Sequence, residues 1–235
     1  MKVIGIHQPG YLPWLGFFKK MLNSDIFVYF DDVSFVKNNY YNRNLIRTNS
    51  GPLQLTIPVR METESKINDV KIDTSQNWQI KHKKSILLNY SKTKYFKNYS
   101  NFIEEVYGGG MEKIIDINIE IIEFLKKEFN IKAKTIFSSE LNVTGTASER
   151  ILEICKLLDG EKYITGTAWA KKFLNVEGFK KNDISVEFQE FVHPEYKQPG
   201  NNFISNMTAF DLLFNEGSIN SSKILKDAVT KNTIA

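Results

Sequence analysis

Short apolar runs alternate along the chain with longer segments in which apolar residues recur three and four positions apart. Residues 1–6 have the pattern of a buried strand, residues 14–23 that of a short helix, and residues 25–30 that of a second strand. A strand, a helix and a strand in immediate succession form a βαβ unit, in which the two strands run parallel. The first part of the chain therefore predicts an α/β fold.

The middle of the chain has a less regular pattern. A polar and aromatic stretch at residues 33–51 is predicted to be a loop, and an alternating strand is predicted at residues 53–59. Helices are predicted at residues 78–90 and at about 98–107, so that a helical insertion over about 76–110 is expected.

Regular alternation returns in the second half. The pattern predicts, in order, a helix at 116–129, a strand at 133–139, a helix at 146–160, a strand at 162–166, a short helix at 168–175, a strand at 184–191 and a helix at 209–217. Alternation of this kind favours a three-layer α/β fold, with a mostly parallel sheet flanked by helices as in Rossmann-like proteins. We expect residues 1–217 to form a single domain and residues 218–235 a polar C-terminal tail.

Composition narrows the functional classes. The chain has 235 residues, 42% of them hydrophobic, which is enough for one substantial core. Its 31 basic and 27 acidic residues leave a net charge of +4. This basic excess is small and is not concentrated in one segment, so it does not predict nucleic-acid binding. No apolar run approaches a membrane span and the start does not resemble a signal peptide, so a cytoplasmic protein is expected. The single cysteine, Cys155, excludes an intrachain disulfide.

Polar side chains follow three of the predicted strands at the points where these strands end. Parallel strands bring their carboxyl ends to one edge of a sheet, where ligands bind in folds of this class. The residues concerned are His7 and Gln8 after the first strand, Asp31 and Asp32 after the second, and Ser138 and Ser139 after the strand at 133–139. We expect them to border one crevice.

Two of the three histidines are candidate catalytic residues. His7 and His193 stand at predicted strand ends, and imidazole suits proton transfer near neutral pH, whereas His82 lies on a basic helix and is expected to pack or be solvated. Adjacent aspartates point to different sides of an extended chain. One of Asp31 and Asp32 is therefore expected to orient a neighbour and the other to face the crevice, and the two are not predicted to form a metal site.

Several residues have the chemistry needed to bind a phosphorylated ligand. Lys37 and Arg43, together with the amide of Asn42, lie in the stretch KNNYYNRN, which suits phosphate or carboxylate recognition; a solvated loop is the alternative interpretation. Tyr11 offers a flat face on which a sugar or base can stack, whereas Trp14 is expected to pack a helix onto the sheet.

Seven blocks, read in order, carry a resemblance to a known family. They are HQPGYLPWLGFF, FDDVSFVKNNYYNRN, LTIPV, SSEL, ITG, HPEYKQ and AFDLLFNEG. The chain resembles the WbqC-like protein family from about residue 3 to about residue 217, and its signature HQPxYLPWxGFF is long and distinctive. The resemblance implies a role in bacterial surface-glycan (O-antigen, lipopolysaccharide) biosynthesis, alongside enzymes that make nucleotide sugars, and adds Gln198 of HPEYKQ to the substrate-binding candidates.

A fainter similarity is to the HIGH-type nucleotidylyl transferases. The stretch GIHQPGYLPWLG parallels their GxFxPxHxGH loop, with Gly5 and Pro9 at the glycine and proline positions. Their two phosphate-polarising histidines fall on Tyr11 and Trp14 here, so the usual adenylyl or cytidylyl transfer lacks its chemical groups.

The leading hypothesis is a transferase that moves an N-acyl or aminoacyl group onto a nucleotide-linked amino sugar. His7 acts as general base in this scheme, an aspartate of the pair fixes its tautomer or holds the sugar, and Gln8 and Ser139 stabilise a developing oxyanion. An acyl or aminoacyl donor is implied, and Mg²⁺ would arrive only with substrate phosphates. The alternatives are nucleotidylyl transfer on a modified HIGH-like scaffold and a non-catalytic nucleotide-sugar-binding protein. Aromatic residues in NNYYN are compatible with a homodimer interface.

Overall fold

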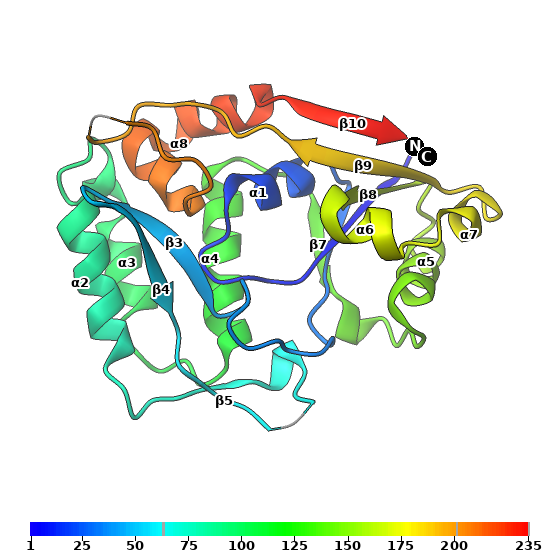
Figure 1. Cartoon of the computed structure of the whole chain (residues 1–235), viewed down its shortest axis with the longest axis horizontal. Coiled ribbons are helices and arrows are strands. Elements are labelled where there is room, and N and C mark those ends of the chain that lie inside the picture. The colour runs from blue at the N-terminus through cyan, green and yellow to red at the C-terminus, as the bar shows by residue number, and fades with distance from the viewer. Residues whose placement is uncertain (63, 201, 235) are drawn as a thin grey trace.

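A mostly parallel sheet organises the protein, as shown by a computed structural model that describes residues 1–62, 64–200 and 202–234 (Figure 1). Within these residues the sheet has six strands in the order β10-β9-β8-β1-β2-β7. Five of them run parallel and β10 is antiparallel to β9. The strands are β1 (Val3–His7), β2 (Ile26–Tyr29), β7 (Lys134–Phe137), β8 (Lys162–Gly166), β9 (Ser185–Phe191) and β10 (Thr230–Ile234).

Helices cover both faces of the sheet, which confirms the predicted α/β fold. The strands are buried on both sides, so alternate residues enter different cores: Phe27 and Tyr29 enter one, and Val28 and Phe30 the other. The first core is covered by α1 (Leu15–Leu22), α4 (Ile114–Glu128) and α8 (Ala209–Asp227). The second is covered by α5 (Ala147–Leu157), α6 (Thr167–Phe173) and α7 (Val176–Lys180).

The middle of the chain adds a hairpin and two helices, which lie on the left in Figure 1. The elements are β3 (Arg43–Thr48), β4 (Gly51–Thr56), α2 (Trp78–Tyr90) and α3 (Ser100–Val106), with a small pair formed by β5 (Val59–Arg60) and β6 (Lys71–Ile72). The loop predicted at 33–51 is wrong over β3. Asn44 and Ile46 of that strand are buried at alternate positions, and the polar residues around them hid this period in the sequence.

The C-terminal stretch also differs from the expected polar tail. Helix α8 continues to Asp227, with a kink where Gly217 has a φ of 73°. Strand β10 then pairs with β9 from Thr230 to Ile234 as an edge strand. Its side chains are largely exposed, so a polar sequence is compatible with this strand. None of the described helices is both long and apolar enough to cross a membrane.

Candidate functional site

A cavity of about 520 Å³ lies at the carboxyl edge of the sheet, between β1 and β8. The chain passes from β1 to β2 and β7 on one side, then returns to place β8 on the other side of β1. The strand order therefore reverses at this cavity, and open α/β sheets bind their ligands at such a point. The volume is in the range of small-molecule sites. We call this cavity the switch-point cavity; its walls come from the end of β1, the segment after it, α1, residues 39–41, the start of α5 and the end of β8.

Buried amides hold the segment that follows β1 and forms one wall. Asn118 of α4 donates to the carbonyls of Pro9 (3.2 Å) and Tyr41 (2.8 Å), and so joins two walls of the cavity. Asn44 of β3 donates to the carbonyls of residues 11 and 12 at 3.2 and 2.9 Å. Since these amides are buried and their donors are satisfied, the shape of the wall is built into the fold.

Two glycines allow close contacts in the same wall. The Tyr11 amide donates to the Tyr40 carbonyl (2.9 Å), and a Cβ on Gly10 would lie only 3.0 Å from that oxygen. The indole of Trp14 folds over Gly16, where a Cβ would overlap the ring. Trp14 thereby lines the cavity, and this arrangement explains why the segment combines aromatic residues with glycine.

His7, the last residue of β1, lines the switch-point cavity as a neutral imidazole. Its Nδ1 lies 2.9 Å from the Gln8 carbonyl, which can only accept, so Nδ1 carries the hydrogen and Nε2 keeps its lone pair. The ring packs edge-on against Phe17 with 5.2 Å between centroids. Burial and, to a smaller extent, the positive charge of Lys20 lower the pKa of His7 to about 3, although the hydrogen bond to the Gln8 carbonyl acts to raise it.

Lys20 of α1 also lines this cavity and is 6% exposed. Its ammonium lies 3.4 Å from the Ile6 carbonyl, and no carboxylate within the described residues forms an ion pair with it. Burial lowers the pKa of Lys20 to about 7. The adjacent Lys19 is equally buried, but it donates to the carbonyls of Leu225 (3.1 Å) and Lys226 (2.7 Å) at the end of α8.

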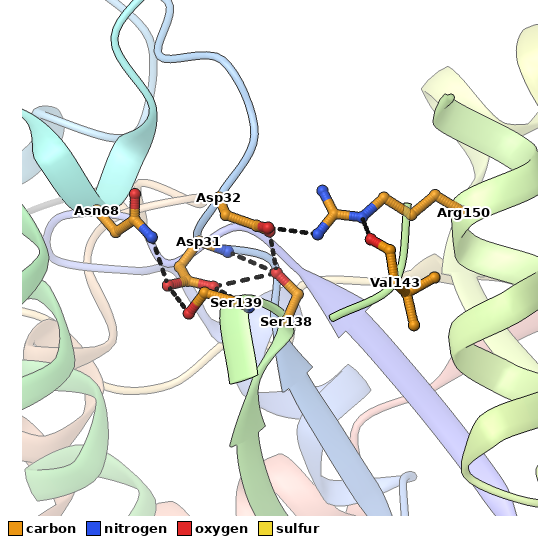
Figure 2. A network of polar contacts seen from close by, with 7 residues as sticks. All are labelled: Asp31, Asp32, Asn68, Ser138, Ser139, Val143 and Arg150. Atoms are coloured by element: carbon orange, nitrogen blue, oxygen red, sulfur yellow. Dashed lines mark hydrogen bonds and ion pairs between the residues drawn. The ribbon is translucent and has the colours of Figure 1, made fainter. Parts of the chain in front are cut away.

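The predicted carboxylate pair lies in a separate network, which Figure 2 shows. The carboxylate of Asp31 is 3% exposed. It accepts from the Ser139 hydroxyl (2.7 Å), the Ser139 amide (3.0 Å) and the Asn68 amide (3.1 Å), and the Ser138 hydroxyl lies 3.0 Å away. Both carboxylate oxygens are therefore occupied by protein donors. This saturation fits a group that fastens the end of β2 to the turn after β7.

Asp32 points to the other side of the same network and pairs with Arg150 of α5 (Figure 2). The Ser138 hydroxyl lies 2.5 Å from Asp32. Burial acts to raise the pKa of Asp32, but the hydrogen bonds from Arg150 and Ser138 outweigh it and lower the pKa overall. Arg150 also donates to the Val143 carbonyl (2.9 Å), so that it anchors the segment before α5.

The expected common crevice for His7 and the aspartates is not observed. His7 lines the switch-point cavity, whereas Asp31 and Ser139 line a different pocket of about 410 Å³. The partner that fixes the His7 tautomer is the Gln8 carbonyl rather than an aspartate. Adjacent residues of an extended chain diverge, and β2 directs its terminal carboxylates toward β7 and α5 instead of β1.

The two aromatic candidates exchange the roles expected from the sequence. Tyr11 has no exposed surface, and its hydroxyl contacts His82 Nδ1 (2.8 Å) and the Tyr107 hydroxyl (2.5 Å) in the core. Trp14 lines the cavity, together with Tyr40. Burial lowers the pKa of His82 to about 4, so His82 is a neutral packing histidine, as its position on a helix suggested.

Three polar residues proposed for phosphate binding lie outside the cavity wall. Lys37 is exposed, Arg43 is half-buried in β3, and the buried Asn42 donates to the Ile57 carbonyl (2.9 Å). None of the three is among the residues that line the switch-point cavity within the described chain.

His193 and Gln198 belong to the segment before α8. His193 Nδ1 lies 3.0 Å from the Pro194 carbonyl, its ring packs among aromatic side chains, and burial lowers its pKa. Gln198 donates to the buried Asp211 carboxylate (2.6 Å) and accepts from Arg47 (3.1 Å). These contacts fit a role in anchoring the segment, and neither residue lines the switch-point cavity.

The sequence interpretation missed Lys20, Asn44 and Thr165, all of which line the cavity. One signal was available for Lys20. Six of the eight residues in LGFFKKML are apolar or glycine, which leaves no wide polar face on this helix. A helix without a polar face is buried, so its two lysines must be buried as well.

Comparisons with known proteins agree with the motif blocks. The sequence matches the model of the WbqC-like protein family over residues 8–223. It is 25% identical over 222 residues to a Mycobacterium tuberculosis (strain ATCC 25618 / H37Rv) protein with the name "Uncharacterized protein Rv1507c"; the alignment covers 93% of this chain and 95% of that protein. No solved structure matches, and the similarity to HIGH-type nucleotidylyl transferases receives no support.

Proposed function

The chain belongs to the WbqC-like protein family, and we propose that it transfers an N-acyl or aminoacyl group to a nucleotide-linked amino sugar held in the switch-point cavity. The observation that carries this proposal is the His7 imidazole: its tautomer is fixed by Gln8, and it lines a cavity at the point where the strand order reverses. The assignment to surface-glycan (O-antigen) biosynthesis rests on the family resemblance.

The lining of the cavity suits the parts of such a substrate. Trp14 and Tyr40 offer aromatic surfaces for a base or a sugar ring. Gln8, Asn39 and Thr165 supply hydrogen-bonding groups for hydroxyls. The remainder is largely apolar, as in most small-molecule sites.

His7 has a defined part in the proposed reaction. The sugar amine attacks the acyl carbon of the donor, Nε2 of His7 takes the proton that the nitrogen loses, and the donor's leaving group departs with the bonding electrons. The protonated imidazole then returns its proton to the leaving group. Nδ1 keeps its hydrogen bond to Gln8 throughout, so the ring does not turn.

One observation favours the non-catalytic alternative, a nucleotide-sugar-binding protein. In the free protein the pKa of His7 is about 3, and a base is most effective when its pKa is near the working pH. Under this alternative the imidazole only accepts a hydrogen bond from the ligand.

Turnover of nucleotide-linked amino sugars by a His7→Gln variant distinguishes the two functions. A panel of such sugars is incubated with acyl and aminoacyl donors, and product is measured by mass spectrometry. If the protein is an enzyme, the wild type should form product, and His7→Gln should form it at a rate lower by a factor of at least about 100. His193→Gln changes a histidine outside the cavity and is expected to retain turnover. Tight binding without product from any pair would support the binding protein and overturn the transferase.

A further inference from the structure

Lys20 is a buried lysine at the wall of the switch-point cavity, and no carboxylate in the part of the chain that the structure describes forms an ion pair with it. Its side chain is 6% exposed and its ammonium has one long contact, 3.4 Å to the Ile6 carbonyl. Among the described residues that line the cavity, Lys20 alone carries a formal positive charge and none is a carboxylate. A charge buried without a partner is destabilising, so the fold keeps an unfavourable group at this position.

We propose that Lys20 is the anion-binding group of the cavity and receives a phosphate or carboxylate group of the ligand next to His7. This inference rests on the proposed function for the identity of the site and adds the chemistry of its substrate. An anionic oxygen at Lys20 would supply the missing counter-charge through short, charge-assisted hydrogen bonds. Lys37 and Arg43, the cations that the sequence suggested, do not line the cavity.

The neighbouring Lys19, on the same helix, is a buried lysine whose ammonium has hydrogen-bond partners within the protein. Lys19 has the same exposure, but two carbonyls at the end of α8 accept its hydrogen bonds within 3.1 Å. The two side chains therefore differ in their hydrogen-bond partners, and the ammonium of Lys20 also lies deeper than that of Lys19. Lys20 faces the cavity, where a ligand can act as the partner.

An anion at Lys20 would also prepare His7 for proton transfer. The positive charge of Lys20 is one of the two causes that lower the pKa of His7. A negative group beside the ammonium offsets that charge, so the imidazole becomes a stronger base when the substrate is bound. The anion site and the general base would then act together, and the part of the pKa lowering that comes from Lys20 would be offset in the complex, although the larger part comes from burial.

Isothermal titration with two simple anions tests the proposal without turnover. Pyrophosphate represents the phosphates of a nucleotide and malonate represents a carboxylate, and each is titrated into the wild type, Lys20→Met and Lys19→Met. We expect one of the two anions to bind the wild type, about tenfold or more weaker binding by Lys20→Met, and binding within about twofold of the wild type by Lys19→Met. The anion that binds identifies the source of the charge.

The outcomes separate this inference from the proposed function. Lys20→Met keeps an unbranched side chain that is one atom shorter and removes a buried charge, so the variant is expected to fold. Equal binding by wild type and Lys20→Met, or no binding of either anion, overturns the inference even if nucleotide-linked amino sugars are turned over. Anion binding that depends on Lys20, in the absence of any turnover, supports the inference and excludes the proposed transferase function.

Discussion

Two polar regions border the carboxyl edge of the same sheet and differ in how their groups are satisfied. The network of Asp31 and Asp32 has several charged groups, and each finds protein donors or a cation: Ser139 and Asn68 for Asp31, and Arg150 for Asp32 (Figure 2). The switch-point cavity is lined mainly by apolar surface, and no carboxylate among the described residues forms an ion pair with its Lys20. A group that is satisfied within the protein stabilises the fold, whereas a group that is not satisfied is available to a ligand. The comparison favours a structural role for the aspartates, and for this reason our proposal places the ligand in the cavity.

The largest expected effect is on stability, at Asp31. Asp31→Ala removes an acceptor for at least three donors in a buried position, so the free energy of unfolding should fall by about 4 kcal/mol. Urea denaturation measures this change. Glu105→Ala, at an exposed carboxylate on α3, is the control and should change stability by less than about 0.5 kcal/mol. A loss at Asp31 as small as the control's would break the comparison, because the network would then not be structural.

A smaller effect is expected at the ion pair of the same network. Arg150→Met leaves the partly buried Asp32 without its cation and should cost about 3 kcal/mol. The double variant Arg150→Met with Asp32→Asn removes both charges and should be more stable than the sum of the single losses predicts. Strictly additive losses in this double-mutant cycle would show that the two side chains do not interact.

Acid should weaken the two regions in different pH windows. The pKa of His7 is lowered from 6.5 to about 3 in the folded protein, so its stabilising contribution is complete above pH 6.5 and is lost as the pH falls toward 3. The loss should be about 2 kcal/mol, less than the full shift implies because His7 is a half-buried residue that borders the cavity. The pKa of Asp32 is lowered from 3.8, so its contribution is lost only below about pH 4. The free energy of unfolding is measured at a series of pH values and plotted against pH. The plot should be flatter than that of the wild type between pH 6.5 and 4 for His7→Gln, and below pH 4 for Asp32→Asn. A His7→Gln plot as steep as that of the wild type would show that His7 is not held as a neutral ring in the folded protein.

The smallest effect compares the two buried lysines. Lys19→Met removes hydrogen bonds to the carbonyls at the end of α8 and should lower the free energy of unfolding by about 1 kcal/mol. Lys20→Met removes an unpaired charge and should leave stability unchanged or raise it. Thermal unfolding of both variants gives the comparison. A greater loss for Lys20→Met than for Lys19→Met would mean that Lys20 is already satisfied within the protein.

The five parallel strands of the sheet could be predicted because each combines a clear period with a nearby turn signal. Strand β8 and helix α2 match their predicted bounds, and the βαβ unit at the start has the expected parallel pairing. Strands β3 and β10 were missed because each has only part of its surface in the core, so that polar residues dilute the alternation.

The site could be predicted only in part. Sequence position indicated that His7 and Gln8 end β1, and both line the cavity. Which strand lies beside β1 is decided by the crossover to β8, and no local pattern contains that information. For this reason the sequence analysis placed His7 with the aspartates at the end of β2, whereas in the structure His7 lines the same cavity as Lys20 and Thr165.

The most direct test of the central claim is a crystal structure of the protein soaked with the tightest-binding nucleotide-linked amino sugar. The account predicts that the ligand lies between the ends of β1 and β8, with an anionic group on Lys20 and its reacting nitrogen within hydrogen-bonding distance of His7 Nε2. A ligand that instead occupies the pocket beside Asp31 and Ser139, with the switch-point cavity unchanged, would contradict it.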